Sequence, residues 1–230
     1  MKDSLMSKIV GLLFFATILV LWWCKETTAG DLVFKYKSPS FSGVGTSSHF
    51  LTIENQEFTR KAEIKSKRIE YSEDEGKNPV WALANKIYSK LPIIYADSDG
   101  LDTVAIRLKG QICENSKILA YHNIYPEMNH NEIVGWHNNA EYFSNYFVLW
   151  VMDKDMNERN KSRQSIISNI LSNLKVKQEI IEVEGDGFKE RFLLLIHYGD
   201  WLSYWCAIMH NTDPSPVKNI QVLKNKLSKI

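Results

Sequence analysis

The chain has 230 residues, of which 28 are Lys or Arg, 27 are Asp or Glu, and 44% are hydrophobic. This length suits one ordinary domain with an appendage, and a formal net charge of +1 gives no excess of charge that would point to nucleic acid. The composition excludes collagen, a disordered chain and a polytopic membrane protein. Cys24, Cys113 and Cys206 form no Cys-x-x-Cys pair, so we predict neither a disulfide scaffold nor a metal site.

The first 29 residues have the pattern of an export signal. Lys2 and Lys8 precede an apolar run over residues 9–23, and small residues lead to a plausible cut after Ala29. The run is shorter than the roughly 18–20 apolar residues that a membrane-spanning helix needs. We therefore predict a signal peptide over residues 1–29, with an uncleaved anchor as the alternative.

The next segment, residues 30–67, contains little material for a core. Leu32, Phe34 and Tyr36 alternate with polar or small residues, as in a short strand. Residues 38–48 are rich in Ser and Gly and predict a loop, whereas the pattern from Leu51 onward is helical and highly charged. We expect a poorly structured segment, which is either a flexible linker or a region that becomes ordered on a partner.

A regular alternation of short apolar segments and helical patterns follows the acidic stretch at residues 71–77. The segments that predict strands are 92–96, 118–122, 146–152 and 179–183. The patterns that predict helices are 79–90, 100–115, 155–174, 188–210 and 214–227. Strands separated by helices predict the α/β class, with an open, mainly parallel sheet and flanking helices.

Two of these helices carry further signals. The helix at 155–174 has one apolar face, made of Ile166, Ile167, Ile170, Leu171 and Leu174. The helix at 188–210 is apolar nearly all round, which favours burial against the sheet and a partner subunit, while His197 and Asp200 argue against a membrane span. For the last helix we predict Asp213 as N-cap and Pro214 as its first residue.

Three polar clusters in this second part could carry chemistry. Glu114 lies in RLKGQICENSK at the end of a helix, His130 lies in a polar loop between two asparagines, and Lys218 lies near the start of the last helix. A carboxylate, an imidazole and an ammonium group together suit proton transfer next to a carbonyl. Each could equally be a solvated surface residue, and spacing in the sequence does not show that the three meet.

Longer motifs carry a specific resemblance. They are SEDEGKNP, ALANKIYSKLPIIY, RLKGQICENSK, HNIYPEMNHNEIVGW and DPSPVKNIQVLK. Residues 71–230 thereby resemble the C-terminal sugar-isomerase (SIS) domain of the bifunctional phosphoglucose/phosphomannose isomerase family. The resemblance implies interconversion of glucose 6-phosphate or mannose 6-phosphate with fructose 6-phosphate, without a metal or other cofactor.

The same resemblance implies a role for each candidate residue. Glu114 would move the proton between C1 and C2, His130 would open the sugar ring from across a homodimer interface, and Lys218 would aid ring opening and stabilise charge. The family holds the sugar phosphate with Ser and Thr residues of an N-terminal SIS domain, for which we find no counterpart here. We therefore expect weak or absent activity of this chain alone, and a sugar-phosphate-binding module without turnover is a further alternative.

A second resemblance covers the N-terminal segment, GDLVFKYKSPSFSG…SSHFLTIENQEFTRK. It is similar to the mature N-terminus of the curli assembly/transport accessory component, although Ser38 and Ser42 depart from the usual pattern. The matching positions, which the resemblance implies would bind the outer-membrane curli secretion channel, are Gly30, Phe34, Tyr36, Pro39, Phe41 and Gly43. The alternative function is thus an exported accessory protein with a fused carbohydrate-derivative-binding domain.

These readings divide the chain into a signal peptide (1–29), a curli-accessory-like segment (30–70) and an SIS-like domain (71–230). The expected partners are a sugar phosphate, a second copy of the chain and the secretion channel, and not nucleic acid. A working leader implies the periplasm or outer membrane, whereas the isomerase family implies the cytoplasm.

Overall fold

The computed structural model describes residues 33–36, 51–55, 58–62, 71 and 78–230. The chain divides into two compact units, Met1–Pro79 and Val80–Ile230. The expected signal peptide lies outside the described residues, as do four residues of the expected channel motif, which are Gly30, Pro39, Phe41 and Gly43. Among the helices in the described part of the chain, none is long and apolar enough to cross a membrane.

In the first unit, the described residues form a three-stranded antiparallel sheet in the order β1-β2-β3. Its strands are β1 (Val33–Tyr36), β2 (Leu51–Asn55) and β3 (Phe58–Ala62). The strand expected near Tyr36 is therefore confirmed, but the helical pattern expected from Leu51 is wrong. Thr52, Ile53 and Thr59 are β-branched and favour extended backbone, and pairing of Asn55 with Phe58 closes a hairpin that competes with a helix.

In the second unit, the described residues form a four-stranded, fully parallel sheet in the order β5-β4-β6-β7. The strands are β4 (Leu91–Asp97), β5 (Tyr121–Tyr125), β6 (Tyr146–Val151) and β7 (Lys177–Ile181). This confirms the predicted α/β class. Two strands are displaced from their predicted ranges, by three residues for β5 and two for β7, because apolar runs locate a strand better than they locate its ends.

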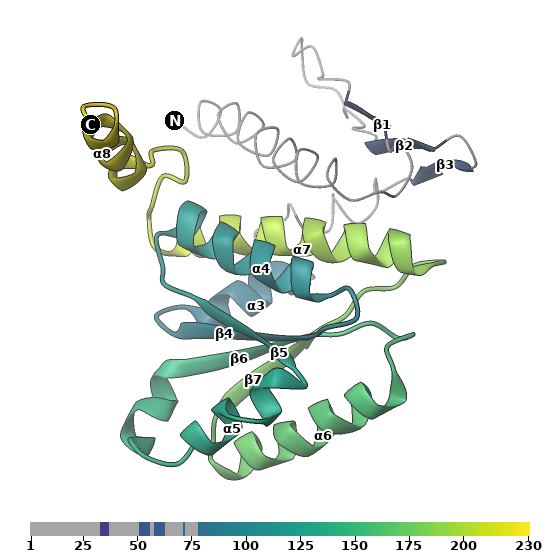
Figure 1. Ribbon diagram of the computed structural model, residues 1–230, viewed down its shortest axis with the longest axis vertical. Helices are drawn as coiled ribbons and strands as arrows, with labels where there is room; N and C mark the ends of the chain where they lie inside the picture. The colour runs from purple at the N-terminus through teal and green to yellow at the C-terminus, as the bar shows by residue number, and fades with distance from the viewer. Residues whose placement is uncertain (1–32, 37–50, 56–57, 63–70, 72–77) are drawn as a thin grey trace. The chain divides into compact units, whose positions relative to one another are not determined.

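Helices cover both faces of this sheet (Figure 1). The helices on one face are α3 (Pro79–Ile87), α4 (Asp102–Gln111) and α7 (Phe188–Met209). Those on the other are α5 (Glu132–Gly135) and α6 (Glu158–Asn173). Single turns and the last helix complete the unit: the π turn η1 (Ile112–Ser116), the 3-10 turns η2 (Glu127–Asn129) and η3 (Ala140–Asn145), and α8 (Lys218–Leu227).

An aromatic cluster fills the space between the sheet and the α5–α6 layer. The ring centroids of Tyr95 and Trp150 lie 5.1 Å apart, and Tyr125 packs against the same indole. Helix α6 contributes Ile167 and Leu171 to this cluster, with Leu174 packed at its edge. The predicted five-residue face of α6 was too wide, because Ile166 and Ile170 are 61% and 38% exposed.

Helix α7 is held by buried polar groups as well as by apolar packing. Arg191 is 1% exposed, and its guanidinium binds Asp153 through Nε at 2.6 Å and Nη2 at 2.9 Å. The same side chain also binds Asp155 at 2.6 Å and donates to the Gly185 carbonyl. This bidentate pair fixes α7 to the loop that follows β6.

The last helix begins later than predicted. Helix α8 starts at Lys218 with Val217 as N-cap, whereas the Asp213 carboxylate accepts a hydrogen bond from the Ser215 backbone N–H. Proline disfavours helical backbone in the residue before it. Pro216 therefore keeps Ser215 out of a helix that Pro214 could otherwise have begun.

We predict that Arg191→Met lowers the free energy of unfolding by about 3–5 kcal/mol at pH 7, because it leaves the Asp153 carboxylate buried without its partner. Arg191 holds the pKa of Asp153 below its usual range. The contribution of the pair is therefore complete above the unfolded pKa of about 3.9 and is lost as the pH falls through the lower folded value. Urea unfolding from pH 7 to pH 3 measures both effects, with the exposed Arg159→Met as control. Equal losses for the two variants would contradict the prediction.

Candidate functional site

Glu114 lies on the π turn η1, which continues α4 without a break. Its neighbours Asn115 and Ser116 are buried, whereas the Glu114 side chain is exposed. Single π turns widen a helix by about one residue and are frequent at functional sites. The wider turn thus directs two neighbouring side chains inward and leaves the carboxylate of Glu114 free to meet a solute.

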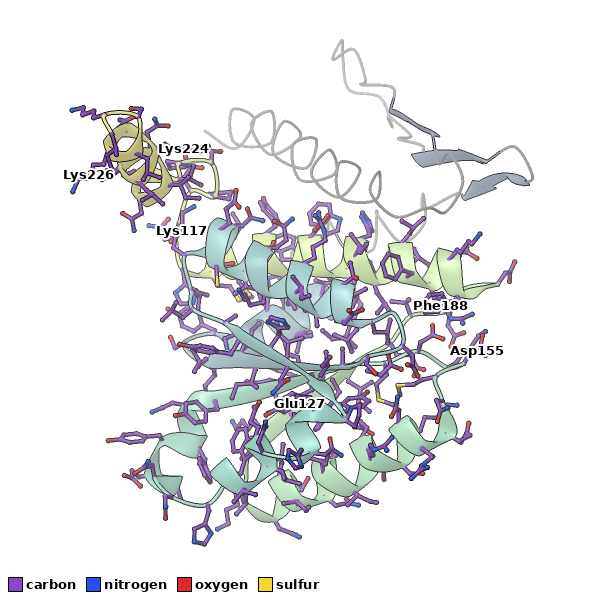
Figure 2. All side chains as sticks on the ribbon, viewed as in Figure 1. Lys117, Glu127, Asp155, Phe188, Lys224 and Lys226 are labelled. Carbon is purple, nitrogen blue, oxygen red and sulfur yellow. The ribbon has the colours of Figure 1, made fainter. Side chains whose placement is uncertain are left out.

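Lys117 ends the π turn and ties it to the segment that leads into α8. Its backbone is left-handed, with φ of 58°, and its Nζ donates to the carbonyls of Glu114 and, at 3.1 Å, Pro214. Burial lowers the pKa of Lys117, and the nearby Glu114 and Asp213 partly oppose that effect. Figure 2 shows Lys117 beside the chain that runs into α8.

Lys218, the third residue expected at the site, is exposed and is the first residue of α8. It follows Pro214 by four residues, and Pro214 is the residue whose carbonyl Lys117 binds. The structure therefore brings the segments that carry Glu114 and Lys218 together at one end of the domain. A carboxylate and an ammonium group on neighbouring segments can move a proton and stabilise the negative oxygen that results.

His130 lies on the opposite side of the sheet, in the loop between η2 and α5. Its side chain is exposed, and its backbone N–H donates to the Glu127 carbonyl at 3.0 Å. Glu127 is below the sheet in Figure 2, in the layer of α5. Glu114 precedes the amino end of β5, whereas His130 follows its carboxyl end. The two side chains of one chain therefore do not meet. At 3.3 Å per residue that strand alone is about 13 Å long.

A second carboxylate anchors the His130 loop to the sheet. Both oxygens of Glu132 are used: Oε1 accepts from the Tyr95 hydroxyl and Oε2 from Asn123 Nδ2, each at 2.5 Å. The Tyr95 hydroxyl in turn accepts from Trp136 Nε1 at 3.1 Å. Burial and the neighbouring Glu132 raise the pKa of Tyr95, so this hydroxyl remains a donor across the physiological range.

The carboxyl ends of β4 and β6 are acidic. In open parallel sheets, ligands bind where successive connections leave toward opposite edges, which is between β4 and β6 here. Asp97 is buried there at the end of β4, with a pKa raised by burial. Asp99 follows in the next turn, and Asp102 is the first residue of α4. Three carboxyl groups at this position disfavour a phosphate. In the described part of the chain, no group of three or more His, Cys, Asp or Glu side chains could hold a metal ion.

Comparison with known proteins places the chain in a family. Residues 76–227 match the family described as "Bacterial phospho-glucose isomerase C-terminal SIS domain". The chain belongs to this family. It is 38% identical over 156 residues to a "Bifunctional phosphoglucose/phosphomannose isomerase" of Caldicellulosiruptor bescii, covering 68% of this chain and 46% of that protein.

A protein of the same name from Aquifex aeolicus is 35% identical over 181 residues, covering 79% of this chain and 55% of the relative. The chain thus spans about half the length of the curated relatives it matches. Among solved structures, a glucose-6-phosphate isomerase-like protein from Thermus thermophilus aligns with a TM-score of 0.52 and 16% identity, covering 63% of this chain and 48% of that one. This likeness confirms the SIS-like fold.

The sequence pointed to Glu114, His130 and Lys218 but not to the residues that hold them. Glu132 lay within the quoted motif around His130, yet its partners Tyr95 and Asn123 come from two different strands. Lys117 closes the motif that contains Glu114, but the sequence does not reveal its role because its second bond reaches a residue 97 positions away. A carboxylate two residues after a loop histidine was the one signal available.

We predict that Tyr95→Phe loosens the loop that carries His130. The change removes the hydroxyl that joins Glu132 to Trp136, at a cost of about 1–3 kcal/mol for buried groups left without a partner. Hydrogen–deuterium exchange should rise over residues 126–136. Tyr146→Phe is the control, since it removes a hydroxyl from the same aromatic region but no bond to Glu132. Unchanged exchange in Tyr95→Phe would contradict this account of the loop.

Proposed function

We propose that this chain acts as the C-terminal half of a phosphosugar aldose–ketose isomerase, with glucose 6-phosphate or mannose 6-phosphate and fructose 6-phosphate as substrates. The observation that carries the proposal is an exposed carboxylate, Glu114, held on a π turn next to the Lys218 segment within a phosphoglucose isomerase family domain. In the proposed reaction Glu114 takes a proton from C1 of the ketose and returns it to C2, so an enediol is the intermediate. Lys218 stabilises the oxyanion of the enediol.

We propose that His130 opens the sugar ring in a site completed by a second copy of the chain. Two features support this assignment: His130 is exposed in an anchored loop, and it lies at the far end of β5 from Glu114 of the same chain. Because β5 is an edge strand of the described sheet, both of its ends lie at the margin of the domain, where another copy can approach.

The carboxyl ends of the described strands in this domain do not offer a binding site for the phosphate group of the sugar. A helix start can bind a phosphate, but the segment from the end of β4 to the start of α4 carries the carboxyl groups of Asp97, Asp99 and Asp102, which repel an anion. Binding energy from the phosphate holds the reacting carbons in place. We therefore propose that full activity needs a second SIS domain and that this chain by itself turns over slowly.

We predict that the chain slowly incorporates deuterium into fructose 6-phosphate in D2O and that Glu114→Gln abolishes this incorporation. The neutral amide cannot take the proton from C1, and loss of a general base typically costs about 10²–10⁴-fold. NMR at high sugar phosphate concentration measures the rate. A wild-type chain that incorporates no deuterium, either alone or fused behind the N-terminal half of the Caldicellulosiruptor bescii relative, would overturn the proposed function.

The control separates a shared site from a folding defect. Glu114→Gln and His130→Ala chains are each expected to be inactive, but in a mixture about half of randomly formed dimers combine one chain of each kind. In such a dimer one of the two sites has both Glu114 and His130, so incorporation returns to about one quarter of the wild-type rate if the two residues come from different chains. A mixture that stays inactive would contradict the role given to a second copy.

We also propose that the N-terminal segment is exported and binds the outer-membrane curli secretion channel. Support comes from the residue pattern quoted above, of which Phe34 and Tyr36 lie on β1. We predict that the exported protein begins at Gly30, because small residues before that position favour cleavage there. N-terminal sequencing decides, and a soluble protein that begins at Met1 would count against both export and channel binding.

A further inference from the structure

The π turn that carries Glu114 needs an external support. A π turn has poorer backbone hydrogen-bond geometry than an α-helix and occurs mostly as a single turn within one. In this chain η1 extends α4 by five residues and ends in a left-handed lysine. Contacts with residues outside the turn must therefore favour the π form over continuation of the α-helix.

Two side chains of the turn reach the same residue on α7. Asn115, 8% exposed, donates through Nδ2 to the Ser203 Oγ at 2.9 Å. Ser116, 2% exposed, donates through Oγ to the Ser203 backbone carbonyl at 2.7 Å. Consecutive side chains of a regular α-helix point about 100° apart. A wider turn reduces this angle, so bonds from positions 115 and 116 to one residue of α7 favour the π form over the α form.

Ser203 is itself fixed within α7. It is fully buried, and its hydroxyl donates to the Asp200 carbonyl at 2.8 Å while accepting from Asn115. The Asp200 carboxylate binds Arg107 Nη2 and Gln111 Nε2, each at 2.9 Å from Oδ1. A continuous line of hydrogen bonds thus runs from α4 through α7 to the π turn.

Ser203 is difficult to explain by packing. Its neighbours in the buried stripe of α7 are Leu202, Trp205, Cys206 and Ala207. Burying a hydroxyl in such surroundings costs free energy unless both its donor and its acceptor are satisfied, and an alanine would fill nearly the same space. The serine at this position is therefore better explained by the hydrogen bonds it makes than by the space it fills.

We propose that Ser203 is a positioning residue for Glu114, which acts by holding η1 in its π form so that the carboxylate faces solvent. This inference rests on the proposed function, since Glu114 is the group that would move the proton. Ser203 is fully buried, so its effect on Glu114 is transmitted through Asn115 and Ser116.

The test compares Ser203→Ala with Cys206→Ala in the full chain. Both changes remove one heavy atom from a buried position of α7, and burial raises the pKa of Cys206 to about 12, so that control is a neutral thiol. Hydrogen–deuterium exchange over residues 110–118 reports the turn. Deuterium incorporation into fructose 6-phosphate reports kcat and KM, and Ser203→Thr keeps the hydroxyl.

Ser203→Ala should raise exchange over the turn and lower kcat about tenfold to a hundredfold, the size of effect expected when a catalytic group is misplaced by about 1 Å. KM should stay within about twofold. Cys206→Ala should change neither, and Ser203→Thr should restore kcat. Should Ser203→Ala fail to fold, Ser116→Ala removes one of the two bonds without altering α7 and should raise exchange in the same segment.

Two outcomes overturn the proposal: unchanged exchange and kcat in Ser203→Ala, or equal changes in Cys206→Ala, which would reveal general destabilisation. A wild-type chain that incorporates no deuterium, neither alone nor in the fusion described above, refutes the proposed function instead. The exchange comparison alone then decides whether Ser203 selects the π turn.

Discussion

The packing of α4 against α7 depends on the hydrogen bonds of the Asp200 carboxylate. This carboxylate accepts from Arg107 and Gln111, one helical turn apart on α4, and so holds α4 in register with α7. The two helices approach closely at Gly199, where an added Cβ would lie only 3.2 Å from Leu108 Cδ1. An ion pair that is nearly buried on both sides costs much to leave incomplete, so the register of α4 is fixed before η1 begins.

Helix α7 carries that constraint across the whole domain. Its 22 residues span about 33 Å at 1.5 Å per residue. Arg191 fixes one end to the loop after β6, and Ser203 meets the π turn near the other. Glu114 and Lys218 thus lie on a turn and at the end of a helix, respectively. At such positions a side chain is held in place by the rigid element and is still exposed to solvent.

The sequence was sufficient for the class of fold and for most elements of the second unit. Apolar runs such as 146–152 predicted buried strands because both faces of a parallel sheet are covered. The hairpin at Asn55 and Phe58 and the late start of α8 were missed, since pairing between strands and the effect of Pro216 on its neighbour outweighed the local helical pattern.

The candidate site was less predictable than the fold for a physical reason. Glu114, His130 and Lys218 belong to polar motifs that stand out along the chain, whereas Ser203 is a single hydroxyl within an apolar helix. The role of Ser203 can be recognised only from its hydrogen bond with Asn115, which is 88 positions away in the sequence. The separation of Glu114 from His130 by the length of β5 could be recognised only once the strand had been placed.

The π turn also limits how this region of the chain can vary in length. Between Arg107, which is tied to Asp200, and Asn115, which is tied to Ser203, the chain has a fixed number of residues. Deleting or inserting one residue there would rotate everything beyond it by about 100° around the helix axis. Substitutions on the exposed side of α4 are therefore compatible with this geometry, but single-residue insertions and deletions are not. In the stretch from α4 to Glu114, the geometry therefore constrains the number of residues more strictly than their identity.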